Sequence, residues 1–98
     1  MKCGSFDNFF MNFANKTKLE IIYSLREGAL SVTEIAEMIG EEQSKVSHNL
    51  RKLSACRILN VEQRGKQRFY SLNKETVLPM LELVEKHVRS YCTGGCER

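Results

Sequence analysis

The chain lacks an apolar run that could cross a membrane, because no segment approaches the roughly 18 consecutive apolar residues that a transmembrane helix needs. Its first residues include one lysine but no continuous apolar stretch, since Asp7, Asn8 and Asn12 interrupt it, so we expect no secretory signal peptide. The 4 cysteines are too few and too unevenly spaced for a secreted disulfide scaffold. These absences favour a cytoplasmic protein with reduced thiols.

The sequence also lacks the side-chain constellations of an enzyme. It has no paired-carboxylate, Ser/His/Asp or phosphate-loop pattern, and its Cys and His residues have no evident orienting partner. With 98 residues, 1 proline, 42% hydrophobic and 28% charged residues, the composition is that of one small folded domain rather than a disordered or fibrous chain. We therefore expect a binding protein and no enzymatic activity.

Positive charge is concentrated in one part of the chain. The net charge is only +3, but between Gln43 and Arg68 seven basic residues accompany one acidic residue, a charge of +6. The rest of the chain then carries −3. Such an uneven distribution is expected when one face of a protein meets a polyanion and another does not.

Helical periodicity at both ends predicts a dimer. Phe6, Phe9, Phe10 and Phe13 recur at the spacing of one helix face, which predicts a helix over about 5–13. A last helix over about 74–92, capped by Asn73, carries an apolar stripe wide enough to pack on two neighbours. A monomer of this size could not bury both surfaces, so we expect a dimer built from the first and last helices.

Between these ends the pattern predicts three more helices. The first spans Lys16–Glu27, with Asn15 as its N-cap and Gly28 as its end, and Leu30 and Val32 form a short extended link after it. Two shorter helices follow and meet near a glycine. They are predicted at Glu34–Ile39, with Thr33 as N-cap and Gly40 as stop, and at Gln43–Cys56, and together they form a helix-turn-helix over about 33–56.

After Arg57 the period changes from helical to alternating. The segment of about 58–72 then predicts a β-hairpin that turns at Arg64-Gly65-Lys66-Gln67. The resulting order, α-α-α-α-β-β-α, is mostly α with one small hairpin and is that of a winged helix-turn-helix. Residues 1–98 are expected to form a single DNA-binding domain, with the hairpin as its wing.

Two segments resemble the ArsR/SmtB family of dimeric, metal-sensing repressors. The segment F-A-N-K-T-K-L-E-I-I (residues 13–22) is similar to that family's L-A-D-P-T-R-L-R-I-L, with Asn15-Lys16 in place of Asp-Pro. The segment I-G-E-E-Q-S-K-V-S-H-N-L (residues 39–50) is similar to its recognition segment L-G-L-S-Q-P-T-V-S-H-H-L. The resemblance extends over nearly the whole chain and implies a repressor that an effector releases from a partly palindromic operator.

The candidate DNA contacts lie on the second helix of the helix-turn-helix and on the hairpin. Side chains on the polar face of the helix can donate to phosphates or base edges, and those at the hairpin suit phosphate or minor-groove contact. They are Gln43, Ser44, Lys45, Ser47, His48, Arg51, Arg64, Lys66 and Arg68. The alternatives are an ordinary solvated helix face and a solvated turn. Glu41 and Glu42 would repel phosphate, and we interpret them as capping residues.

The family's two common sensory sites are incomplete in this sequence. The family segment L-C-V-C-D-L corresponds here to L-S-V-T-E-I (residues 30–35), in which hydroxyls replace both sulfurs. A second family site uses carboxylates and histidines of the last helix, and Glu85 and His87 resemble only half of it. The resemblance therefore does not supply a sensory site at either place.

The remaining candidate effector ligands are Cys92, Cys96 and Cys3. Two glycines between Cys92 and Cys96 allow a loop to close on one soft ion, and Cys3 could add a third sulfur if the first and last helices pack together. Three thiolates suit As(III), or Cd(II), Zn(II) or Pb(II) with one further ligand. The alternatives are a redox pair and idle thiols, and Cys56 is interpreted as a small buried residue.

The sequence thus predicts a homodimeric, sequence-specific regulator of transcription that binds double-stranded DNA and no membrane. It is expected to act as a repressor that a thiophilic metal or metalloid releases. The alternative is an effector-independent or redox-responsive winged-helix protein that binds DNA or another protein, of viral or mobile-element origin.

Overall fold

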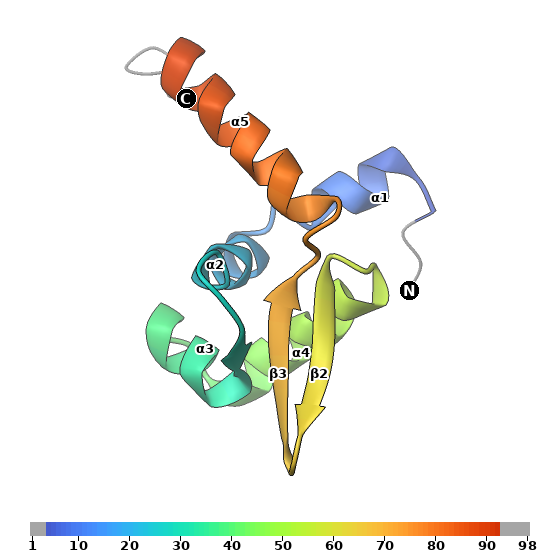
Figure 1. Cartoon of the computed structure of the whole chain (residues 1–98), viewed down its shortest axis with the longest axis vertical. Helices are drawn as coiled ribbons and strands as arrows, with labels where there is room; N and C mark the ends of the chain where they lie inside the picture. Colours follow the sequence, from blue (N-terminus) through green and yellow to red (C-terminus); the bar gives the residue numbers. More distant parts are fainter. Residues whose placement is uncertain (1–3, 93–98) are drawn as a thin grey trace.

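The computed structural model describes residues 4–92 and shows five helices and a three-stranded antiparallel sheet within them (Figure 1). In chain order the elements are α1 (Phe6–Met11), α2 (Lys16–Ser24), β1 (Leu30–Ser31), α3 (Val32–Ile39), α4 (Gln43–Ala55), β2 (Leu59–Arg64), β3 (Gln67–Leu72) and α5 (Val77–Tyr91). The predicted winged helix-turn-helix order is confirmed, with β1 as an additional short strand.

The core lies where α2, α3 and α4 meet the sheet. Ile21 and Ile22 of α2, Ile35 of α3 and Leu50 and Leu53 of α4 are fully buried there. Each such side chain contributes about 1.5–3 kcal/mol by leaving water. Because the apolar side chains of α4 recur at helical spacing, its opposite face is left to polar residues.

The turn between α3 and α4 follows the prediction, but the start of α3 does not. Gly40 adopts a left-handed conformation (φ 72°) that ends α3, as expected of a glycine after a helix. The N-cap of α3 is Ser31 rather than Thr33: its hydroxyl accepts from the Glu34 backbone N–H at 3.3 Å, while the Glu34 carboxylate accepts from the Ser31 N–H at 2.9 Å. Ser31 can form this reciprocal pair because a glutamate lies three residues later.

The wing is built on a two-residue turn. In β2 and β3, Arg64 pairs with Gln67 across Gly65 and Lys66, and Gly65 has φ 61°, a value that favours glycine in such a tight turn. The link predicted at Leu30 and Val32 is instead the strand β1, since Leu30 and Ser31 pair with β3. Val32 already belongs to α3. A strand of two residues is too short to show the alternation by which sequence patterns indicate strands.

Two of the predicted helix ends are wrong by about one turn. α2 ends at Ser24, and residues 25–27 form a turn before Gly28. α5 begins at Val77 rather than near residue 74, because the Asn73 side chain accepts from the backbone N–H groups of Glu75 and Thr76 and holds this stretch in a turn. Asn73 therefore caps this turn, and the helix proper begins after it.

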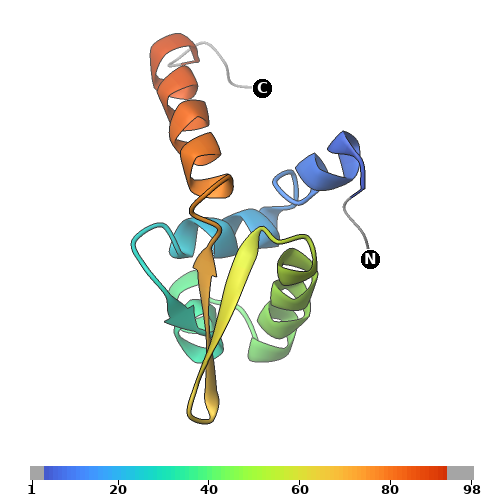
Figure 2. The ribbon, with the colours of Figure 1, turned by 45° about the vertical axis from the view of Figure 1, so that its right-hand side comes forward.

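α5 extends away from the rest of the domain (Figures 1 and 2). Only its first turns are embedded, with Val77 and Leu81 buried against the core. Midway along it, Glu85 accepts from Arg26, which follows α2, in an ion pair of 2.9 Å whose side chains are each 24% exposed. The tip of the wing and the far end of α5 lie at opposite ends of the molecule (Figure 1).

The structure contains no membrane-crossing helix in residues 4–92, since none there is both long and apolar enough.

Candidate nucleic-acid interface

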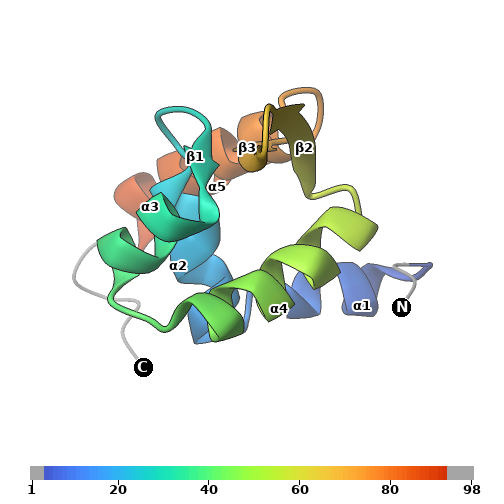
Figure 3. The same ribbon diagram turned by 90° about the horizontal axis from the view of Figure 1, so that it is seen from below.

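Helix α4 presents its polar face to solvent. Val46, Leu50 and Leu53 anchor it in the core. The predicted contacts on the other face are accessible, with Ser47 half-buried and the rest exposed: Gln43, Ser44, Lys45, His48 and Arg51. Seen from below, α4 lies along one side of the domain with the hairpin beside its C-terminal half (Figure 3). The helix can therefore approach a large surface without disturbing the core.

A cleft of about 570 Å³ separates α4 from the wing. It brings together four of the predicted DNA contacts, Ser47 and Arg51 from the helix and Lys66 and Arg68 from the hairpin. These four residues are far apart in the sequence and now line one surface. Three of them are cationic, and Arg and Lys side chains supply most protein contacts to nucleic-acid phosphates.

Strand alternation places Arg64 on the other face of the wing. The strand register pairs Gln63 with Arg68, and both line the cleft, whereas Arg64 points to the opposite face. There its guanidinium contacts the Glu62 carboxylate at 3.1 Å and lies 4.5 Å from the centre of the Phe69 ring. Arg64 is thus separate from the cationic group in the cleft, although it remains exposed near the wing tip.

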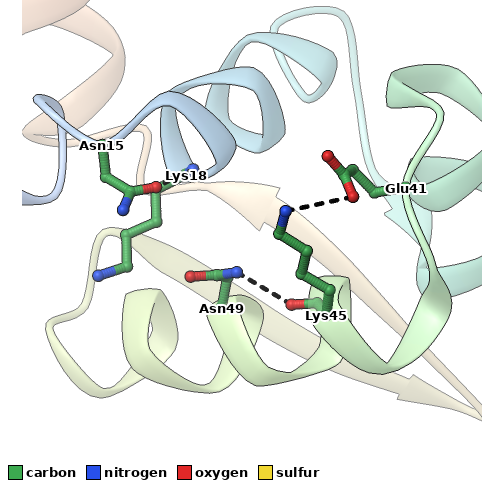
Figure 4. Close-up of polar contacts among 5 residues, drawn as sticks. All are labelled: Asn15, Lys18, Glu41, Lys45 and Asn49. Atoms are coloured by element: carbon green, nitrogen blue, oxygen red, sulfur yellow. Dashed lines mark hydrogen bonds and ion pairs between the residues drawn. The ribbon is translucent and has the colours of Figure 1, made fainter.

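At the start of α4, Lys45 turns back toward the preceding loop (Figure 4). Its ammonium group lies 3.4 Å from the Glu41 carboxylate, and the Asn49 amide donates to the Lys45 carbonyl at 2.9 Å. The ion pair between Lys45 and Glu41 is partly exposed and therefore weak. Glu42 occupies the N-cap position, in agreement with its interpretation as a capping residue, although its side chain makes no capping hydrogen bond, and Glu41 precedes the cap. Glutamate is a poor N-cap because its longer side chain does not fold back onto the first turn as aspartate or serine does.

Outside the cleft, Lys18 of α2 and Lys52 of α4 form a pair of cationic residues that the sequence patterns did not indicate. Burial and, to a smaller extent, the charge of Lys52 lower the pKa of Lys18, which stands in the first turn of α2. Figure 4 shows the Lys18 side chain directed toward α4. Like charges held together in this way favour an anionic partner. Their separation of 34 positions explains why no local motif revealed the pair.

Helices α1 and α5 expose large apolar side chains, as the prediction of a dimer requires. On α1, Phe6 is 84% and Phe10 54% exposed. On α5, the exposed apolar residues are Leu83, Val84, Val88 and Tyr91. Exposed apolar clusters of this kind usually mark surfaces that bind another molecule. The apolar stripe predicted for the last helix is thus buried at the start of α5 and exposed over the rest of the helix.

The proposed sensory thiols can be located only in part. Cys92 is half-buried at the C-cap of α5, whereas Cys3 and Cys96 lie outside the described residues. Within residues 4–92 no group of three His, Cys, Asp or Glu side chains could hold a metal ion. Because only Cys56 and Cys92 lie in that range, any site of three thiolates must draw on at least one of the two cysteines outside it.

Glu85 and His87, the half of a family site, and Cys56 have identifiable contacts. Glu85 is engaged by Arg26, and the His87 ring lies 5.0 Å from that of Tyr91, so the partial family site on the last helix is not assembled within the described residues. Cys56 packs against the core and is disulfide-bonded, so the expectation of reduced thiols is wrong for this residue. Sequence spacing alone could not show which sulfur atoms the fold brings together.

Comparison with known proteins identifies the family. The sequence model for bacterial regulatory proteins of the arsR family matches residues 15–61. Over 85 residues the chain is 41% identical to the HTH-type transcriptional regulator NmtR of Mycobacterium tuberculosis. The aligned residues make up 87% of this chain and 71% of NmtR. The chain belongs to the arsR family of bacterial regulatory proteins. The matched residues of this arsR-family chain extend from the N-cap of α2 into β2 and so include the helix-turn-helix.

One further relative supports the arsR-family assignment, and one solved structure supports the fold. The arsenical resistance operon repressor of Bacillus subtilis is 31% identical over 77 residues, covering 78% of this chain and 73% of that protein. The homodimeric winged helix-turn-helix DNA-binding domain of Mb0332 from Mycobacterium bovis superposes with a TM-score of 0.79 at 23% identity, over 90% of this chain and 82% of that chain. The superposition shows that the fold is a winged helix-turn-helix.

Proposed function

We propose that this arsR-family protein is a homodimeric, sequence-specific repressor that binds double-stranded DNA through α4 and the wing. The observation that carries the proposal is the cationic cleft beside the exposed polar face of α4. A helix of this kind enters the major groove while the wing reaches the neighbouring minor groove. The protein acts in the cytoplasm by binding, without catalysis.

The predicted contacts divide into readers of bases and neutralisers of phosphate. Side chains of the first two turns of α4 face the groove floor and read base edges: Gln43, Ser44, Lys45, Ser47 and His48. Arg51, Lys66 and Arg68 neutralise phosphates next to the cleft. Arg64 projects from the other face of the wing and so would serve a different phosphate from the one beside the cleft.

The proposed dimer joins the exposed apolar faces of α1 and α5. Two observations support it, the exposed aromatic and aliphatic side chains of both helices and the homodimeric state of Mb0332. A twofold dimer presents two copies of α4 to the DNA, and these must be spaced about 34 Å apart to enter successive major grooves on one side of the duplex.

The proposed effector is a thiophilic ion, As(III), Cd(II), Zn(II) or Pb(II), held by Cys92, Cys96 and Cys3 when all 4 cysteines are reduced, which requires that the disulfide of Cys56 is first opened. Cys92 stands at the end of α5, next to the proposed dimer surface, and the Bacillus subtilis relative is named for arsenical resistance. The ion would crosslink thiolates, which are the ligands that soft ions prefer. A changed packing of α5 in the dimer would then alter the separation of the two α4 helices.

The DNA-binding proposal is tested with a duplex that the wild-type protein enriches from a random pool. The Arg51→Ala and Lys45→Ala variants should weaken binding. Lys66→Ala should lower affinity for all duplexes and reduce the slope of log affinity against log salt by about one unit, because it neutralises one phosphate. Lys86→Ala, which removes an exposed charge of α5, is the matched control. An unchanged salt slope would exclude Lys66 from the interface.

The effector proposal is tested by titrating the protein–DNA complex, with its thiols kept reduced, with As(III), Cd(II), Zn(II) and Pb(II). One of these ions should lower DNA affinity by about 5- to 150-fold, the usual range for allosteric coupling. The Cys92→Ser/Cys96→Ser double variant should bind DNA normally and ignore the ion. A full response of the double variant would show that these thiols are not the sensor, and release of wild-type protein by an oxidant alone would favour a redox response instead.

A further inference from the structure

The cleft between α4 and the wing has no acidic side chain in its lining, which consists entirely of described residues. Besides Arg51, Lys66 and Arg68, four side chains with neutral polar groups contribute to it: Ser47, Ser54, Gln63 and Tyr70. Gln63 and Ser54 were not among the residues predicted to contact DNA. The cleft thus combines three positive charges with four groups that can donate hydrogen bonds.

The regular geometry of the two elements creates this composition. Ser47, Arg51 and Ser54 follow one another at four- and three-residue spacing, so they form one stripe along α4. On the hairpin, alternation and register place Gln63 opposite Arg68 on the face that looks toward that stripe. The acidic side chain of the wing, Glu62, falls on the other face. The hairpin therefore directs its negative charge away from the cleft.

The position of the cleft determines what would pass through it. A sugar–phosphate strand always separates a major groove from the minor groove next to it. If α4 occupies the major groove and the wing the adjoining minor groove, that strand must run between them, through the cleft. Arg, Ser and Gln side chains are common partners of phosphate and sugar oxygens, and such contacts fix the register of a protein on the duplex.

We infer that the cleft clamps one DNA strand and that Gln63 and Ser54 are additional contacts to its phosphates, an inference that rests on the proposed function. The Gln63 amide donates to the Gly65 carbonyl at 3.0 Å, and its second N–H is left for a phosphate oxygen. The Ser54 hydroxyl is buried and has no hydrogen-bond partner within residues 4–92. Rotation about χ1 moves it among three staggered positions, and a phosphate oxygen would supply the missing acceptor.

The first test compares Gln63→Glu with Asn60→Asp. Both changes turn an amide into a carboxylate on β2, but Gln63 faces the cleft and Asn60 the opposite face. On the enriched duplex at 0.1 M salt, Gln63→Glu should lose affinity by about tenfold, the effect of roughly 1.4 kcal/mol, and Asn60→Asp by less than about threefold. Equal losses with intact wild-type binding would overturn the clamp alone, whereas absence of wild-type binding to any duplex would overturn the proposed function as well.

A second variant avoids the hydrogen bond that Gln63 makes in the turn. Ser54→Ala removes the unpartnered hydroxyl and should leave thermal stability unchanged or slightly raised, because no hydrogen bond within the described chain is lost. Its DNA affinity should nevertheless fall by about threefold, the effect of one hydrogen bond of roughly 0.7 kcal/mol. Unchanged affinity in Ser54→Ala would remove this residue from the clamp.

Phosphate ethylation interference gives the position of the clamp directly. In the wild-type complex, ethylation should block binding at the phosphates between the major groove of each half-site and the adjoining minor groove. In the Arg68→Gln variant, ethylation of these phosphates should interfere less with binding, whereas ethylation at other positions should interfere as it does with the wild-type protein. Interference confined to the far side of the major groove would overturn the inference.

Discussion

At the scale of single residues, the electrostatics of Lys18 are unfavourable in the free protein. Its ammonium group is partly desolvated and stands near Lys52, and both effects lower its pKa. A base whose pKa is lower in the folded state binds fewer protons there than in the unfolded state, so stability rises as the pH increases through that lowered pKa. At neutral pH the charge on Lys18 therefore costs stability.

We predict that Lys18→Gln stabilises the protein at pH 7, by about 0.3 kcal/mol, because water still screens most of this half-buried charge. Lys16→Gln is the matched control, because it removes the same charge from the same first turn of α2 and shares any effect of the helix dipole. The advantage of Lys18→Gln over Lys16→Gln should shrink with added salt and at alkaline pH. Thermal unfolding across pH and salt measures it, and equal effects of the two variants would contradict the account.

Individual contacts are where the sequence was least informative. The predicted DNA residues on α4 are accessible because the apolar stripe of Val46, Leu50 and Leu53 fixes which face of the helix is buried. Lys18, Ser54 and Gln63 could not be found in this way, since their significance depends on neighbours that belong to other elements of the fold. The opposite placement of Arg64 and Arg68 followed from strand register, and a loop longer or shorter by one residue would have placed both side chains on one face.

At the scale of elements, periodicity predicted the helices well and their ends poorly. Gly40 ends α3 and Asn15 caps α2 as predicted, because both signals act through local backbone chemistry. The start of α3 was missed because two hydroxyl residues that can serve as N-caps, Ser31 and Thr33, precede the apolar pattern. Only Ser31 has a glutamate at the third following position, and this glutamate completes the reciprocal pair of hydrogen bonds. The strand β1 was missed because its pairing with β3 is long-range.

The capping difference gives a sharp test with two similar variants. Ser31→Ala removes the hydroxyl that caps α3 and should cost about 1 kcal/mol, a decrease of roughly 4–8 °C in the unfolding temperature of a domain of this size. Thr33→Ala changes an exposed side chain within the helix and should cost less than about 0.5 kcal/mol. Thermal or urea unfolding measures both, and the reverse order of the two losses would show that Thr33 is the cap.

At the scale of the whole molecule, the wing and the outer part of α5 lie at opposite ends (Figure 1). The cationic cleft is lined by α4 and the wing and is therefore on the side away from that part of α5. Arg26 and Glu85 link α5 to the segment that follows α2, and buried Val77 and Leu81 hold its first turns against the core. A change in how α5 packs in a dimer would therefore be transmitted to the position of the core and of α4 relative to the twofold axis.

The central claim is that two chains present two α4 helices to one side of a duplex. Selection from a random duplex pool, followed by sedimentation of the complex with the enriched duplex, tests it most directly. We expect an inverted repeat whose half-sites are centred about 10 base pairs apart, or about 34 Å, with two chains bound to each duplex. Enrichment of a single unrepeated half-site bound by one chain, or no enrichment above non-specific binding, would contradict it.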